Sequence, residues 1–256
     1  MGSGAGAVES GTMGGTAGQG SVVSPIPEHE HELRSDFHTS LDRLDDDFVS
    51  VALLVAESLP RLTREFIRGN KQSIHDAREM AAAVDDQCLA VEEEAFVLLA
   101  REAPVSGDLR RIVALLRLVH DVERSASLLR HVSETLDRFD PRELPPGLQE
   151  KVSELGDRAT DVFRAGVDAW RRRDGLAINE VEQLDHLVDR LQEVILEESS
   201  GLEQEMGAEM LVLGLIARYY ERIADHGVAL AQDAAFVATG DRVLLKGRQT
   251  EAADDA

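Results

Sequence analysis

The sequence predicts an all-α protein made of two tandem three-helix bundles, with six long helices in total. Three observations lead to this prediction. Apolar residues recur at helical spacing from Leu33 to Gly240, breaker residues divide that region into six segments, and two pairs of motifs recur at nearly the same separation. Each bundle would leave part of its apolar surface uncovered, so we expect the two to pack together.

The apolar residues recur every three or four positions, which places them on one face of a helix. Three clear runs are Leu41, Leu44, Phe48, Val51 and Val55; Leu148, Val152, Leu155, Ala159 and Val162; and Val181, Leu184, Val188, Leu191 and Ile195. No four-residue stretch shows the alternation of a strand bounded by turn residues. Hydrophobic residues make up 43% of the chain and aromatic residues only 4%, so the core must be mainly aliphatic.

Breaker residues mark the expected helix ends. They are Gly69-Asn70, Pro104, the group Pro141, Pro145, Pro146 and Gly147, then Asp174-Gly175 and Gly207. These positions give a disordered Gly- and Ser-rich tail over 1–32, a first three-helix repeat over 33–143, a second over 144–240 and a polar tail over 241–256.

Four further positions carry local predictions. Pro60 lies inside the first helical run and should kink or break that helix, because it removes a backbone donor. Gly166 lies inside the fourth run and indicates a close approach of another helix, because glycine otherwise costs a helix roughly 1 kcal/mol. Ser106 or Asp108 is expected to cap the third helix.

The two halves of the chain repeat each other. A Glu-Arg pair begins at Glu123 in the third helix and at Glu221 in the sixth, while similar aspartate-led motifs begin at Asp86 and Asp185. Both pairs are separated by nearly the same number of residues, which indicates an internal duplication.

Charge and cysteine content narrow the class of protein. The formal net charge is -22, so a nucleic-acid backbone would be repelled and basic surfaces or cations are better partners. The single cysteine, Cys88, permits no internal disulfide, which suits a cytoplasmic protein. No signal peptide opens the chain, and the apolar run from Leu211 to Ala217 is too short to insert into a membrane.

Two pairs of acidic residues are the candidate metal ligands. Asp185 and Asp189 are four residues apart on one predicted helix, and Glu221 and Asp225 are four apart on another, so each pair points to one side. If the two sides meet, four oxygen ligands converge, which suits Mg, Mn, Ca or Fe. The alternative is that these carboxylates form a solvated acidic face, as acidic pairs do on many helices.

Several motifs resemble the PhoU family over Leu33 to about Gly240. The resembling segments are L-R-S-D-F-H from Leu33, F-V-L-L-A-R-E-A-P-V-S-G-D-L-R from Phe96 to Arg110, Y-E-R-I-A-D-H from Tyr220 to His226, and A-T-G from Ala238. The resemblance implies two three-helix bundles and multinuclear metal sites on E/D-x-x-x-D motifs. The family's metal is iron or zinc, and together with the oxygen ligands this leads us to expect Fe, Mn, Mg or Zn here.

The resemblance also implies a function. PhoU proteins are negative regulators of the phosphate-starvation response and of phosphate transport. They contact the phosphate sensor histidine kinase and the ATPase subunit of the phosphate ABC transporter, often as homodimers. We therefore expect a cytoplasmic adaptor that is not an enzyme.

The family's motif is complete only in the second half. Asp185, Asp189, Glu221 and Asp225 all match it, and His226 follows the last motif as a further candidate ligand. In the first half Asp86 and Glu123 match, but Ala90 and Ser127 replace the partner aspartates. We expect one metal site in the second bundle and a lost or weaker one in the first.

Two other functions remain open at this point. One is a carboxylate-bridged dinuclear metal oxidase or ferroxidase in a helical bundle. Such sites use a Glu-x-x-His motif, and in this sequence that motif occurs only as Glu28 and His31, within the predicted tail. The other is a plain helical scaffold whose acidic pairs are merely hydrated.

Overall fold

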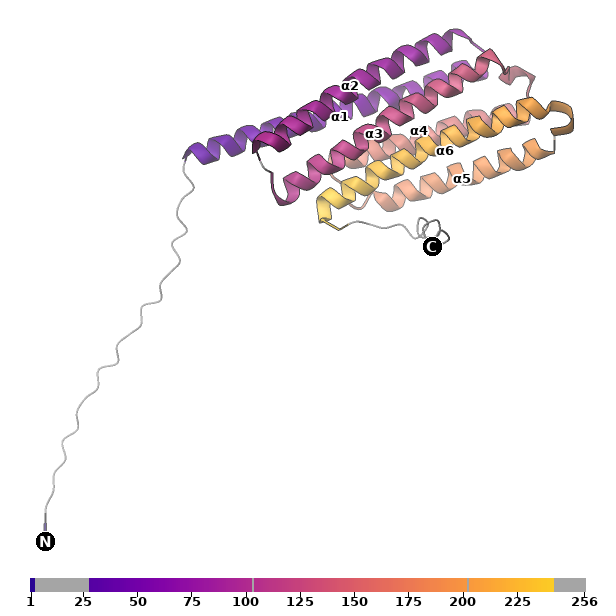
Figure 1. The fold of residues 1–256 in the computed structure, drawn as a ribbon. Helices are drawn as coiled ribbons and strands as arrows, with labels where there is room; N and C mark the ends of the chain where they lie inside the picture. Colours follow the sequence, from indigo (N-terminus) through magenta and orange to yellow (C-terminus); the bar gives the residue numbers. More distant parts are fainter. Residues whose placement is uncertain (3–27, 103, 202, 242–256) are drawn as a thin grey trace, which may run out of the picture.

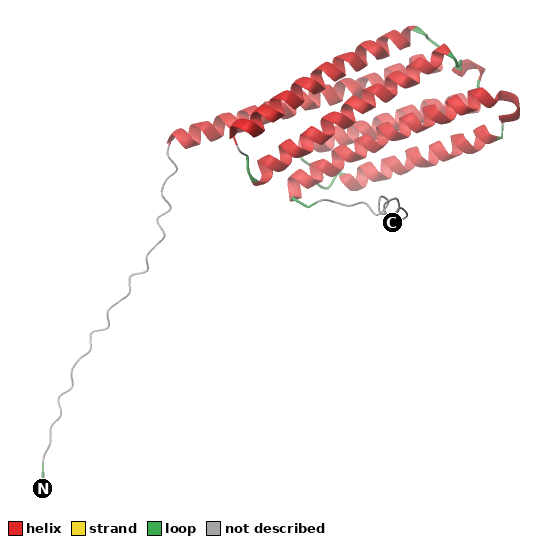
Figure 2. Cartoon of the chain, in the orientation of Figure 1, coloured by secondary structure: helices red, strands yellow, loops and turns green. Residues whose placement is uncertain are grey.

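The computed structural model describes residues 1–2, 28–102, 104–201 and 203–241, which form six α-helices (Figure 1). The helices are α1 (Glu28–Ile67), α2 (Gln72–Glu102), α3 (Ser106–Glu134), α4 (Pro146–Arg172), α5 (Ile178–Ser200) and α6 (Glu203–Thr239). Two short 3-10 helices, η1 (Thr135–Asp137) and η2 (Pro141–Glu143), connect α3 to α4. These ranges contain no strand, so the all-α prediction is confirmed (Figure 2).

The six helices form two three-helix bundles that lie side by side. Helices α1 to α3 make the first bundle and α4 to α6 the second, with α3 beside α6 and α1 beside α4 (Figure 1). The buried apolar residues of both bundles form one continuous core. The tandem-bundle prediction is therefore confirmed, and packing the bundles together covers the apolar surface that each would otherwise expose.

Helix α4 shows how the sequence determines an element. Its predicted apolar residues, from Leu148 to Val162, are buried. Pro146 occupies the first turn, where its missing N–H costs nothing. The helix ends at Arg172, because the next residue, Arg173, has a left-handed φ of 53°. The N–H of Asp174 then donates to the carbonyl of Ala169 at 3.0 Å.

The close approach predicted at Gly166 is present. A Cβ atom added to Gly166 of α4 would lie 2.1 Å from the carbonyl oxygen of Gly227 of α6. Conversely, a Cβ atom added to Gly227 would lie 2.7 Å from the Cα atom of Phe163 on α4. Two glycines therefore allow the backbones of α4 and α6 to touch, which offsets their unfavourable helix propensity.

Two predicted helix breaks are absent. Helix α1 continues past Pro60, because Leu59 and Leu62 on either side are fully buried and their packing outweighs the lost hydrogen bond. Gly207 lies inside α6, and the turn between α5 and α6 falls at Gly201 instead. Burial of a 37-residue helix readily offsets the roughly 1 kcal/mol cost of one glycine.

Two predicted helix starts also differ from the structure. Helix α1 begins at Glu28, so 28–32 belongs to a helix rather than to the tail, while 3–27 and 242–256 lie outside the described residues. Neither Ser106 nor Asp108 caps α3, because Val105 occupies the N-cap position and no side chain makes the cap hydrogen bond. Ser106 has a φ of 51°, and Asp108 Oδ2 lies 3.3 Å from Nε2 of His38 on α1.

Among the helices in the described ranges, none combines the length and the apolar character needed to cross a membrane.

Candidate metal centre

The structure brings the four predicted carboxylates to one face of the second bundle. Helix α5 carries Asp185 and Asp189, and the adjacent α6 carries Glu221 and Asp225. Burial raises the pKa of Asp185 to about 7, and the charges of Asp189, Asp225 and Glu221 add to the effect in that order. The four groups are therefore close enough to repel one another.

Glu221 is the most buried carboxylate of this group, with 8% of its surface exposed. Burial raises the pKa of Glu221 to about 7, and Asp225 adds to this rise. Arg218, one turn earlier on α6, forms an ion pair with Glu221 and opposes the shift. The second carboxylate oxygen of Glu221, Oε2, is buried without a hydrogen-bond partner.

A fifth carboxylate, Glu182, belongs to the same group. Its charge also raises the pKa of Asp185, and Glu182 Oε1 and Asp185 Oδ1 are both buried without a hydrogen-bond partner. The sequence analysis missed Glu182, although its position three residues before Asp185 places it on the same side of α5. Buried oxygens without partners cost free energy, and a bound cation would satisfy them.

The donor chemistry fits a hard cation, but the side chains do not converge. Within the described ranges, no three His, Cys, Asp or Glu side chains are placed to hold one ion as they stand. All five acidic groups offer oxygen, which suits Mg, Mn, Ca or Fe. The nitrogen of His186, Nδ1, lies 3.9 Å from Asp189 Oδ2.

His226 contacts the first bundle. Its Nδ1 lies 2.8 Å from Ser125 Oγ, and its Nε2 lies 4.0 Å from Asp121 Oδ1, both on α3 of the first bundle. Adjacent residues on a helix point about 100° apart, so following Asp225 in sequence turns His226 toward the other bundle. Its role in this structure is a contact between bundles.

The first bundle lacks two of the motif carboxylates, because Ala90 and Ser127 stand in their places. Burial raises the pKa of Asp85, and the charge of Glu123 raises it further, so Asp85 lies on the side of α2 that is near Glu123. The sequence analysis had placed Asp86 in this position. Ser127, in the position of a lost aspartate, accepts a hydrogen bond from Arg130. Burial raises the pKa of the Cys88 thiol to about 12, which disfavours it as a metal ligand.

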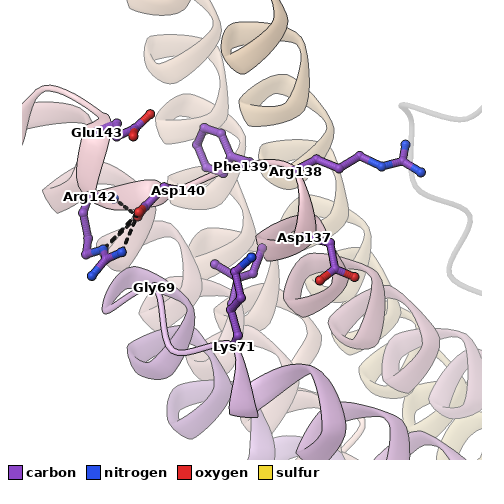
Figure 3. Close-up of a pocket in the computed structure, with 9 residues that line it drawn as sticks. Gly69, Lys71, Asp137, Arg138, Phe139, Asp140, Arg142 and Glu143 are labelled. Atoms are coloured by element: carbon purple, nitrogen blue, oxygen red, sulfur yellow. Dashed lines mark hydrogen bonds and ion pairs between the residues drawn. The ribbon is translucent and has the colours of Figure 1, made fainter.

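Two surface pockets lie apart from these carboxylates. One, with a volume of about 280 Å³, lies at the junction of the α1–α2 turn with η1 and η2 (Figure 3). Figure 3 shows the Arg142 guanidinium turned onto Asp140. Arg142 Nη2 donates to Asp140 Oδ2 at 2.6 Å. The other, of about 230 Å³, is lined by Asp45, Arg111 and Trp170. None of the four predicted ligands lines either pocket.

The fold and this face define a class: a tandem three-helix-bundle protein with a carboxylate-rich face on its second bundle. The chain matches the model of the PhoU domain twice, over residues 48–136 and 152–234. One match falls in each bundle. The chain therefore belongs to the PhoU family.

Comparisons with individual proteins agree with the family. The chain is 29% identical over 214 residues to "Phosphate-specific transport system accessory protein PhoU homolog 1" of Mycobacterium leprae, covering 81% of this chain and 95% of that protein. It is also 29% identical over 214 residues to the PhoU homolog 2 of Mycobacterium tuberculosis, covering 81% and 99%.

Solved structures share the fold. The phosphate transport system regulatory protein PhoU from Streptococcus pneumoniae matches with a TM-score of 0.75 and 19% identity, covering 82% of this chain and 100% of that one. PhoU from Pseudomonas aeruginosa matches with a TM-score of 0.72 and 23% identity, covering 80% and 100%.

Proposed function

We propose that this chain is a regulator of phosphate transport that damps phosphate uptake and the phosphate-starvation response when phosphate is plentiful. The observation that carries the proposal is the match of both bundles to the PhoU domain, joined to relatives named as accessory proteins of phosphate-specific transport. The match extends over 81% of the chain, so it involves both bundles.

The regulator would act as a cytoplasmic adaptor, not as an enzyme. Its partners would be the ATPase subunit of the phosphate ABC transporter and the phosphate sensor histidine kinase, and it would work as a homodimer. The net charge of -22 favours partners with basic surfaces, because opposite potentials speed association and exclude wrong partners.

The second bundle would hold a metal ion on Asp185, Asp189, Glu221 and Asp225. The support is the mutual repulsion of these groups and the buried oxygens of Asp185 and Glu221 that have no partner. A bound cation would offset both costs and tie α5 to α6. The ion would be Fe, Mn, Mg or Zn, and the oxygen donors favour the harder members of this set.

Deleting the gene tests the regulatory role. In phosphate-rich medium, the deletion strain should express a phosphate-starvation reporter and take up excess phosphate, and the intact gene should reverse both effects. If a second family member is present, the double deletion is made as well. Normal reporter and normal uptake in the double deletion would contradict the proposal.

Metal analysis tests the site separately. Purified protein is offered Fe, Mn, Mg and Zn one at a time, and the bound metal is measured by mass spectrometry after gel filtration. Asp189→Ala with Asp225→Ala should abolish binding of the retained metal. The matched control, Asp85→Ala with Glu123→Ala in the first bundle, should keep it. Protein that stays metal-free in every case would sink the metal proposal and leave the regulatory proposal intact.

A further inference from the structure

The outer face of α2 exposes large apolar side chains. Leu89 is 57% exposed, Phe96 55% and Val97 49%. Phe96 is unusual for this chain, because the other phenylalanines of the described ranges are at most 8% exposed, apart from the partly buried Phe236. A single exposed apolar residue needs no explanation, but an aligned set on one face of a helix indicates a contact surface.

Leu89 and Phe96 are aligned along the helix. They are seven residues apart, so they point in nearly the same direction and lie about 10 Å apart along the axis of α2. Small residues extend the line, since Ala82 and Ala100 lie on the same side and are exposed. Carboxylates flank it on both edges: Asp85 and Glu92 on one side, and Asp86 and Glu93 on the other.

These carboxylates have no cationic partner close by. In the described part of the chain, no ion pair within 4.0 Å includes any of the four, whereas carboxylates of nearby elements are paired, as in Arg78–Glu134 at 2.8 Å and Arg61–Asp76 at 3.0 Å. Arg130 acts on Asp85 only through longer-range attraction. The apolar line therefore lies between two edges of unneutralised negative charge.

We propose that this face of α2 is a docking surface for a cationic amphipathic helix of another protein. Apolar anchors about two turns apart on that helix would pack against Leu89 and Phe96, and flanking Lys or Arg residues would pair with the carboxylates. A second copy of this chain packed through the same face would bring these carboxylates against one another, and their like charge opposes that contact. The inference goes beyond the proposed function, because the partner need not belong to the phosphate system and the contact requires no bound metal.

Synthetic peptides test the proposal on the full chain by fluorescence anisotropy. The probe is an 18-residue helical peptide with leucines at positions seven apart and Lys or Arg on both flanks. One control peptide has the same composition in scrambled order, and another has Glu on the flanks. The basic amphipathic peptide should bind at least tenfold more tightly than either control, and its affinity should fall as salt is raised.

Variants locate the contact. Leu89→Ser with Phe96→Ser should weaken binding at least tenfold, and Glu92→Lys with Glu93→Lys should weaken it by a similar factor. The matched control is Leu211→Ser with Leu215→Ser, which removes two exposed leucines from α6 and should leave binding unchanged. All of these positions are exposed or partly exposed, and circular dichroism checks that each variant is folded.

Three results would overturn the proposal. Equal binding of the scrambled peptide would mean that the chain attracts basic peptides through charge alone. Unchanged binding by both the serine and the lysine variants would place the contact elsewhere. Sedimentation equilibrium gives the third: if the serine variant turns a dimer into a monomer and the wild-type chain does not bind the peptide, the face joins two copies of this chain.

Discussion

The hydroxyl of Tyr220 on α6 lies 2.9 Å from Thr63 Oγ1 on α1, so a buried hydrogen bond links the two bundles. Thr63 donates its own hydroxyl hydrogen to the carbonyl of Leu59 at 2.8 Å, so Tyr220 must be the donor of the bond between them. Thr63 also faces Gly156 of α4, where an added Cβ would lie 2.5 Å from Thr63 Cγ2. Helices from both bundles therefore meet at this threonine.

Tyr220→Phe should lower the free energy of unfolding by about 1 kcal/mol, because it removes one buried hydrogen bond while keeping the packed ring. Urea unfolding measures the change. Tyr219→Phe is the matched control, since Tyr219 is only partly buried and its ring contacts His131, and its effect should stay within about 0.5 kcal/mol. Equal losses in the two variants would mean that the buried Tyr220 hydroxyl contributes no more than the hydroxyl of the partly buried Tyr219.

Substitution of two glycines by alanine should have opposite effects. Gly166→Ala should destabilise the protein by about 3 kcal/mol, because its Cβ would lie 2.1 Å from the backbone oxygen of Gly227 and the two helices would have to separate. Gly207→Ala should stabilise it by up to about 1 kcal/mol, because nothing lies within 4 Å of the new Cβ in α6. Thermal unfolding midpoints that move the same way in both variants would contradict this account.

The two glycines also show what the sequence can and cannot predict. The apolar stripes predict the helices because each stripe must be buried, and Gly166 within a stripe indicates a helix contact. Gly207 looks equally like a breaker in sequence, yet it continues α6, because the burial that keeps the helix intact comes from distant residues. Pro60 is similar: the packing of Leu59 and Leu62 decides the outcome.

The sequence predicts which residues of the candidate site share a helix face, but not which of two adjacent residues points into the site. Asp185 with Asp189, and Glu221 with Asp225, follow from spacing alone, because residues four apart share a face. One-residue differences are harder, since each step turns the helix by about 100°. That step separates Asp86 from Asp85 on α2, and it turns His226 toward Ser125 of α3.

The raised pKa values of Asp185 and Glu221 predict how stability changes with pH. In the unfolded chain these groups ionise near their usual values of 3.8 and 4.5, whereas in the folded protein both keep their protons to about pH 7. Between these limits the folded state binds more protons than the unfolded state. The free energy of unfolding contributed by these groups therefore falls as pH rises from about 4 to about 7.

Asp185→Asn with Glu221→Gln should remove this contribution. With chelator present, the variant should match the wild-type protein near pH 4 and exceed it by about 2 kcal/mol near pH 7.5, an order-of-magnitude figure for two coupled groups. Thermal unfolding from pH 4 to 8 measures the difference. Asp168→Asn, at an exposed pair with Arg171, is the control and should run parallel to the wild type. A parallel course for the double variant would show that the two carboxyls do not resist ionisation.

A buried ion pair between α1 and α3 gives the last prediction. Arg111 of α3 is 7% exposed, and its Nε donates to Asp45 Oδ2 at 2.5 Å while its Nη2 donates to Asp42 Oδ1 at 2.7 Å. Arg111 lowers the pKa of the exposed Asp42, but burial still raises the pKa of Asp45 above its usual value. Asp45 therefore depends on a nearby cation to remain ionised.

Arg111→Met should cost about 3 kcal/mol at pH 8, because it leaves the Asp45 carboxylate buried without its main partner. Arg173 lies 3.5 Å from the same oxygen and limits the loss. The loss should shrink at pH 4, where Asp45 can take up a proton, and Asp45→Asn should restore part of the stability in the double variant. Arg61→Met, at the exposed pair with Asp76, should cost less than about 1 kcal/mol. A loss from Arg111→Met that is the same at both pH values would come from lost packing of the arginine side chain and not from the unpaired charge of Asp45.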